Sequence, residues 1–107
     1  MAFNRGVNMN AIFSYVNKVI YDGMGTGTTT LRLYENRVEV LYTSVMNGAV
    51  VTSQYIWSIK NIKRVDLINS RQDVQLVIDN SPALKAPKTA DAVANLEKFV
   101  QIVKEML

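Results

Sequence analysis

The sequence predicts an α+β domain in which a twisted antiparallel sheet is closed by a C-terminal amphipathic helix. Through residues 28–56, apolar and polar side chains alternate with a period of two, as in half-buried strands. From residue 92 onward, apolar side chains recur at steps of three and four instead, which is the period of a helix. With 107 residues, 49% of them apolar, the chain is long enough for one hydrophobic core.

The predicted helix has one apolar stripe and one polar face. Thr89 is the expected N-cap, because its hydroxyl can accept a hydrogen bond from a free N–H of the first turn. Asp91 and Lys104 carry the charges that suit the two ends of the helix dipole. The stripe, which we expect to pack against the sheet, consists of Ala92, Val93, Leu96, Phe99, Val100, Val103, Met106 and Leu107.

Two turn signals set the register of a three-stranded meander. A two-residue turn at Glu35-Asn36 places Leu33 opposite Val38. Asn47-Gly48 is the preferred dipeptide of a type I′ hairpin, and it places Val38 opposite Trp57. Both registers gather the same side chains on one surface. We predict this surface to be the inner face of the sheet: Leu31, Leu33, Val38, Val40, Tyr42, Val51, Tyr55 and Trp57.

Apolar runs in residues 62–68 and 74–78 predict two further strands. A four-residue loop at 70–73 would place Leu67 opposite Leu76, with both side chains facing the core. A turn at residues 79–82 and a short strand at residues 83–86 complete the predicted order.

Residues 1–20 are expected to form an N-terminal extension to the domain of residues 21–107. Their apolar spacing fits a helix, whereas the run that ends before Asp22-Gly23 also fits a strand, and both alternatives stay open. The predicted sheet offers no core partner to the large side chains of this segment, which favours an interface or a cover for a sheet edge. The candidate interface residues are Phe3, Phe13, Tyr15 and Val16.

Three stretches carry a resemblance to a known family. They are residues 21–38, which include Thr30-Leu31-Arg32-Leu33-Tyr34, residues 56–65 with Ile56-Trp57-Ser58-Ile59, and the closing helix. Together they resemble a pleckstrin-homology-like domain of the short bacterial type, over residues 21–107. The resemblance implies an open barrel of two roughly orthogonal antiparallel sheets, with the C-terminal helix plugging one end.

Several chemistries lack their residues in this sequence. The chain has no cysteine and no histidine, which removes disulfides, zinc sites with thiolate or imidazole ligands, and histidine-based acid–base catalysis. Residues 23–28 are rich in glycine but lack the lysine of a phosphate-binding loop, so we expect a flexible connector there. We therefore expect no enzymatic activity, no metal site and no cofactor.

The basic cluster Lys60, Lys63 and Arg64 is the candidate ligand-binding site. It would suit an anionic small ligand or a phospholipid headgroup, although Arg64 is also expected to pair with Asp79 across two strands. Family members that bind phosphoinositides use basic residues around the loop between their first two strands. The corresponding loop here, Glu35-Asn36-Arg37, does not match that pattern.

The sequence favours a non-enzymatic binding or assembly module that acts through protein–protein contacts and forms a homo-oligomer. Binding of an anionic ligand or of acidic lipid by the basic cluster is the alternative. The net charge of +3 comes from 12 basic and 9 acidic residues that are mixed along the chain, so no nucleic-acid partner is expected. Without a transmembrane run or a secretory signal, we expect a cytoplasmic protein.

Overall fold

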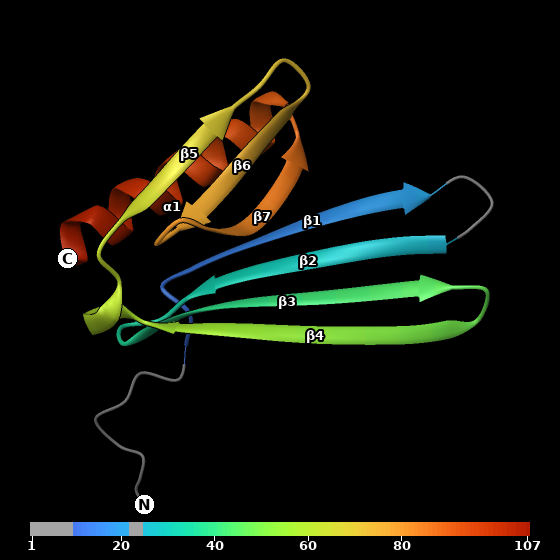
Figure 1. Ribbon diagram of the computed structural model, residues 1–107, viewed down its shortest axis with the longest axis horizontal. Helices are drawn as coiled ribbons and strands as arrows, with labels where there is room; N and C mark the ends of the chain where they lie inside the picture. The colour runs from blue at the N-terminus through green and yellow to red at the C-terminus, as the bar shows by residue number, and fades with distance from the viewer. Residues whose placement is uncertain (1–9, 22–24) are drawn as a thin grey trace, which may run out of the picture.

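The computed structural model describes residues 10–21 and 25–107. Within them the order of elements alternates short turns with strands and ends in a single long helix (Figure 1). The elements are β1 (Phe13–Tyr21), β2 (Gly25–Leu33), β3 (Arg37–Met46), β4 (Ala49–Ser58), the 3-10 helix η1 (Ile59–Asn61), β5 (Val65–Asn69), β6 (Asp73–Ile78), β7 (Ser81–Pro87) and α1 (Ala90–Met106).

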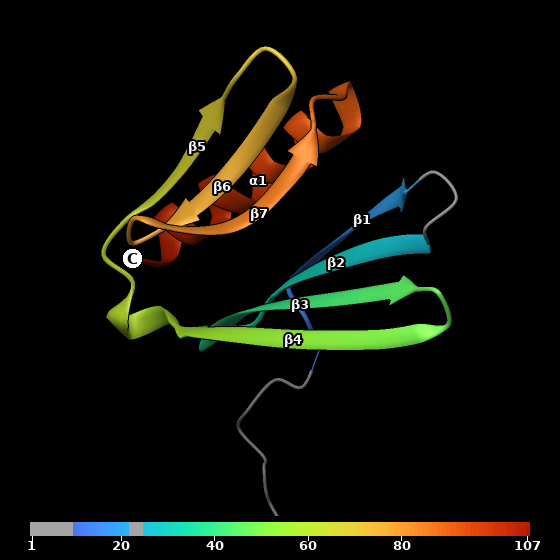
Figure 2. The ribbon, with the colours of Figure 1, turned by 45° about the vertical axis from the view of Figure 1, so that its right-hand side comes forward.

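The strands form two antiparallel sheets, which confirms the α+β class. One sheet has four strands in the order β1-β2-β3-β4, and the other has three in the order β5-β6-β7. The two sheets face each other, and α1 lies against the three-stranded sheet (Figures 1 and 2). The chain passes from one sheet to the other through η1, which follows β4 directly.

Both predicted hairpin registers are confirmed. Leu33 lies opposite Val38, and Val38 lies opposite Trp57. Asn47 and Gly48 have φ angles of 51° and 81°, the left-handed pair that a type I′ turn requires. Because directly opposite residues share a face, these two local turns sort the side chains of three strands onto two faces.

The second sheet also follows the predicted pairing, since Leu67 lies opposite Leu76. Asp79 and Asn80 both have positive φ angles, of 49° and 67°, and form a tight turn into β7. The last strand, β7, is longer than predicted, and its pairing with β6 shifts in register between Leu76 and Val77 of β6, which pair with Leu84 and Pro82.

The N-terminal segment is a strand of the four-stranded sheet. All nine residues of β1 pair with β2, so the boundary expected at residue 20 falls inside a strand. Residues 25–28, expected in a connector, already belong to β2. Phe13 and Tyr15 are each only 9% exposed and belong to the core, so the expectation that this segment has no core partner is wrong.

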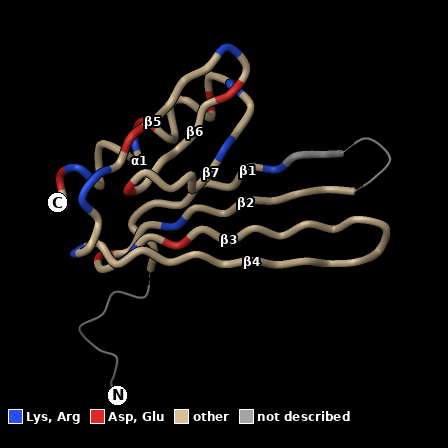
Figure 3. The backbone as a smooth tube through the Cα atoms, in the orientation of Figure 1, with Lys and Arg blue, Asp and Glu red and all other residues tan. Residues whose placement is uncertain are grey.

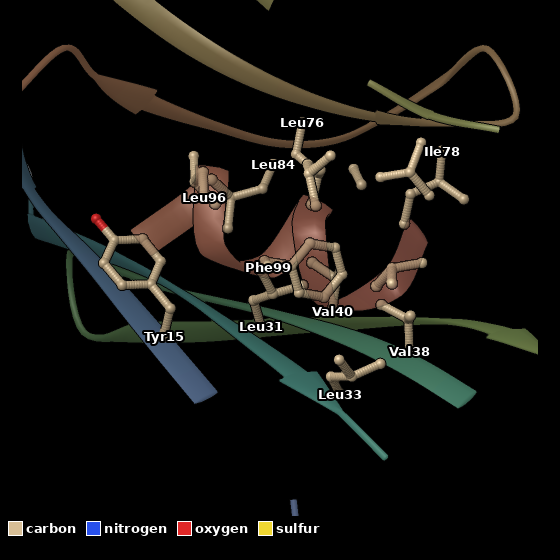
Figure 4. Packing of buried hydrophobic residues seen from close by; sticks show 14 of the residues in the cluster. Tyr15, Leu31, Leu33, Val38, Val40, Leu76, Ile78, Leu84, Leu96 and Phe99 are labelled. Atoms are coloured by element: carbon tan, nitrogen blue, oxygen red, sulfur yellow. The ribbon is translucent and has the colours of Figure 1, made fainter. Parts of the chain in front are cut away.

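The core lies between the two sheets and α1 (Figure 4). Phe99 reaches from the helix into the space between the sheets, and its ring centroid lies 6.0 Å from that of Phe13. Thr89 caps the helix as predicted, because its Oγ1 accepts a hydrogen bond of 3.0 Å from the N–H of Ala92. Five residues of the predicted stripe are buried, Val93 and Met106 are partly buried, and Leu107 at its end is exposed.

The two faces of β1 provide a test of this arrangement. Phe13→Ala should lower the free energy of unfolding by about 3–5 kcal/mol, because it leaves a cavity between β1 and Phe99. Val16→Ala is the matched control on the exposed face, and it should cost less than about 1 kcal/mol. Denaturant unfolding measures both values. Equal losses would mean that β1 does not separate a core face from a solvent face.

Candidate functional site

The inner face of the four-stranded sheet is only partly covered. At one end Leu31, Leu33 and Val40 are fully buried, as predicted. At the other end Val51 is 63% exposed and Tyr55 is 52% exposed, so their predicted place in the core is wrong. The strands β5 to β7 have 5, 6 and 7 residues, whereas β3 and β4 have 10 each. The longer strands therefore extend beyond their cover (Figure 1).

Three aromatic side chains mark the border of the covered region, and we call them the aromatic row: Tyr42, Tyr55 and Trp57. The rings of Tyr42 and Tyr55 meet edge to face, with centroids 5.6 Å apart, and those of Tyr55 and Trp57 are 6.4 Å apart. Trp57 and Tyr42 are partly buried against the core, whereas half of Tyr55 is open to solvent. The aromatic row thus continues the core onto an exposed surface.

Two clefts flank the aromatic row where β7 approaches the four-stranded sheet. One, of about 420 Å³, is lined by Tyr55, Ile56, Trp57, Ser81 and Pro82. The other, of about 290 Å³, separates β7 from β2 and β3, and its lining includes Tyr42 and Lys85. The Tyr42 hydroxyl spans the two sheets, because it donates a hydrogen bond to the carbonyl oxygen of Ala83.

The outer edge of β4 has no neighbouring strand in the described part of the chain (Figures 1 and 2). Along two antiparallel strands, residue pairs that are hydrogen-bonded to each other alternate with pairs that are not. The two residues that flank a two-residue turn form a hydrogen-bonded pair. Ile59, just beyond β4, donates its N–H to the carbonyl of Asn36 at 2.9 Å, which fits the same alternation. The odd-numbered residues of β4 therefore bond to β3, and Val50, Thr52, Gln54 and Ile56 present their N–H and C=O groups to the open edge.

β4 differs from the other three edge strands that the structure describes. β1 carries Lys18, β5 carries Asp66, and β7 carries Lys85 and two prolines. β4 has ten residues with neither a charge nor a proline, and Figure 3 shows no charged position along it. Charges and prolines are the usual protection of an edge strand against pairing with another chain. The four exposed large apolar residues of this unprotected strand are Val50, Val51, Tyr55 and Ile56.

The basic cluster lies on η1 and the segment that follows it, and Lys60, Lys63 and Arg64 are all exposed. The expected ion pair of Arg64 with Asp79 is not formed. Arg64 Nε instead lies 2.6 Å from Oδ2 of Asp66, two residues along the chain. The Asp79 carboxylate accepts the backbone N–H groups of Lys63 and Arg64, at 2.8 and 2.9 Å. Asp66 thus pairs with one of the three cations, and Asp79 binds the backbone of the cluster; binding of an anionic ligand by Lys60, Lys63 and Arg64 stays a prediction.

The predicted interface residues do not share one surface. Phe3 lies outside the described residues. Phe13 and Tyr15 point into the core, whereas Val16 points to the opposite face of β1 and is 55% exposed. The strand β4 was predicted from the sequence, but its open edge was not identified as a contact surface, although ten residues without charge or proline are a signal that the sequence contains.

Acidic clusters for a metal ion and helices able to span a membrane are absent from the described part of the chain. Its Asp and Glu side chains nowhere come together in a group of three or more that could hold a metal ion. No helix within residues 10–21 and 25–107 combines the length and the apolar character that crossing a membrane requires. No protein-family model, curated protein or solved structure matches this chain.

The hydrogen bond between Tyr42 and Ala83 should stabilise the contact of the two sheets. Tyr42→Phe removes the donor, leaves the carbonyl of Ala83 without it, and should lower the free energy of unfolding by about 0.5–1.5 kcal/mol at neutral pH. Denaturant unfolding at pH 7 measures the loss. An unchanged free energy would show that this bond does not contribute to stability.

The same hydroxyl should make stability depend on alkaline pH. Burial, and next the nearby Tyr55, raise the pKa of Tyr42 above its ordinary value of 10.0. The unfolded chain therefore loses this proton first, so the contribution is fully present below pH 10 and is lost as the pH rises towards the folded-state pKa. Unfolding measured from pH 8 to 11 should show a shallower decline for Tyr42→Phe than for the unmodified chain. Parallel declines would contradict the assignment.

Proposed function

We propose that this protein is a non-enzymatic binding and assembly module of pleckstrin-homology-like fold, which acts through protein–protein contacts and forms a homo-oligomer. The observation that carries the proposal is the open edge of β4, ten residues long and free of charge and proline. The contact surface consists of this edge together with the exposed end of the aromatic row.

The order of the elements supports the pleckstrin-homology-like part of the proposal. A four-stranded meander, a crossing through η1, a three-stranded meander and a closing C-terminal helix are the parts that such a domain requires. The first strand is β1 rather than the segment after residue 21, so the likeness extends over more of the chain than the sequence indicated. The fold itself leaves the function open, because one architecture serves many functions.

The open edge of β4 supplies the two kinds of interaction that strand addition uses. Backbone N–H and C=O groups of alternate residues point outward, ready to form a ladder with an added strand. Exposed apolar side chains on both faces of the same strand, such as Val51 and Ile56, would be buried by that strand. A surface with both features favours another protein chain over a small ligand.

The polar groups near the clefts support a non-enzymatic role. The chain contains no histidine, the base most often used to activate a hydroxyl. Lys85, which lines the cleft beside β7, has its Nζ 3.5 Å from the Asp73 carboxylate. Its ammonium group is thus engaged by a carboxylate rather than placed to deprotonate a neighbouring serine or threonine.

Lysines placed on the β4 edge should abolish the assembly. The unmodified chain should show a mass above that of the monomer by light scattering, increasing with concentration. Thr52→Lys combined with Gln54→Lys should return it to the monomer, because both residues offer their backbone to the open edge and charges there block pairing. The matched control is Ser14→Lys with Val16→Lys, which adds the same charges to the exposed face of the other edge strand, β1.

The control variant should keep the mass of the unmodified chain. A monomer at every concentration of the unmodified chain would refute the assembly. An unchanged mass of the Thr52/Gln54 variant would refute the role of β4.

A further inference from the structure

We infer that the chain which occupies the β4 edge is β4 of a second copy, paired antiparallel about a two-fold axis that passes through Ser53. This inference rests on the proposed function, and it adds the identity of the partner and the register of the contact. In this arrangement the two four-stranded sheets join into one continuous sheet.

The backbone of β4 restricts the registers that are possible. Only the even-numbered residues have N–H and C=O groups directed to the open edge, so an even-numbered residue must lie opposite an even-numbered residue of the partner. About Ser53, Thr52 lies opposite the partner's Gln54, and Val50 lies opposite the partner's Ile56. Each of these pairs can exchange both of its hydrogen bonds across the axis.

The side chains of β4 are arranged symmetrically about Ser53. On the outer face, Val50 and Ile56 are related by the axis, and they are 64% and 58% exposed. On the inner face, Val51 and Tyr55 are related in the same way, at 63% and 52%. The four exposed large apolar side chains of the strand thus form two pairs of apolar residues, with the polar Thr52, Ser53 and Gln54 between them.

Neighbouring registers lose this match. With the axis at Gln54, Thr52 would lie opposite the partner's Ile56, and Val50 opposite the partner's Ser58. With the axis at Thr52, Val50 would lie opposite the partner's Gln54. Both shifts set apolar residues against polar ones, whereas the Ser53 register sets apolar against apolar and polar against polar.

The absence of charge on β4 has a specific consequence for a two-fold contact. In an isologous interface a residue that contacts a given residue of the partner is contacted in return by that residue's copy, and residues near the axis lie close to their own copies. A single lysine near the middle of β4 would therefore meet its copy across the axis, and like charges so placed are destabilising. The strand carries none, although Lys18, Asp66 and Lys85 are placed on the three other edges.

The joined sheet also extends the aromatic row. A two-fold axis perpendicular to the sheet keeps the inner faces of both copies on one side. Tyr55 then lies beside the partner's Val51, in a pair that is not hydrogen-bonded and in which side chains approach most closely. The solvent-exposed half of Tyr55 is covered by this neighbour, which accounts for a large aromatic side chain at a position that the three-stranded sheet leaves open.

Disulfide trapping tests the register directly, because the chain has no cysteine of its own. In full-length Ser53→Cys, the two introduced residues face each other with Cα atoms about 4.5 Å apart, within the range that a disulfide spans. Mild oxidation should convert most of this variant to a covalent dimer on a non-reducing gel. Val51→Cys is the matched control: it lies on the same face and is also exposed, but its copy is roughly 14 Å away along the strands.

The double variant Val51→Cys with Tyr55→Cys provides a second readout. Each new cysteine lies opposite the other type in the partner, so this variant should form a covalent dimer where Val51→Cys alone does not. Efficient cross-linking of Val51→Cys, or none in both Ser53→Cys and the double variant, would overturn the register. If the register is overturned but the unmodified chain still assembles through β4, the proposed function stands. A monomeric unmodified chain would refute both the assembly and the register.

Discussion

The unequal size of the two sheets is the constraint on which the remaining features depend. A three-stranded sheet of short strands, together with one helix, has to cover a four-stranded sheet whose last two strands have 10 residues each. Where the cover is present, Leu31, Leu33 and Val40 are sealed from solvent around Phe99. Where it ends, the same face continues through Tyr42 and Tyr55 into solvent. The core and the exposed surface are thus two ends of a single face.

The sequence predicted what short-range geometry determines. Two turns, Glu35-Asn36 and Asn47-Gly48, were sufficient to set the pairing of β2, β3 and β4, because a hairpin's register follows from its turn. The N-cap at Thr89 was predictable for the same reason, since a cap involves only one turn of helix. Hairpin registers and helix caps can therefore be predicted from the sequence in other folds as well, because they depend on only a few neighbouring residues.

What the sequence could not give was the extent of the cover and the choice between competing partners. Alternation places Tyr55 on the same face as Val40, but whether that position is buried depends on a sheet formed by residues far along the chain. The sequence offers Arg64 two carboxylates, those of Asp66 and Asp79. Arg64 forms its ion pair with Asp66, whereas Asp79 accepts hydrogen bonds from backbone N–H groups. The apolar side chains of β1 fitted helix and strand alike until β2 was available to pair with them.

An edge strand without charge or proline tends to pair with other chains. The remaining edge strands of this protein carry the residues that prevent such pairing. The other three edge strands, β1, β5 and β7, each carry at least one charged residue, and they belong to the same protein in the same solvent. A general lack of protection therefore does not explain β4. Its apolar residues are also not spread at random along the strand, since they flank a polar centre at matching distances on both faces. A partner with an unrelated sequence would require no such symmetry, whereas a second copy related by a two-fold axis requires it at every pair.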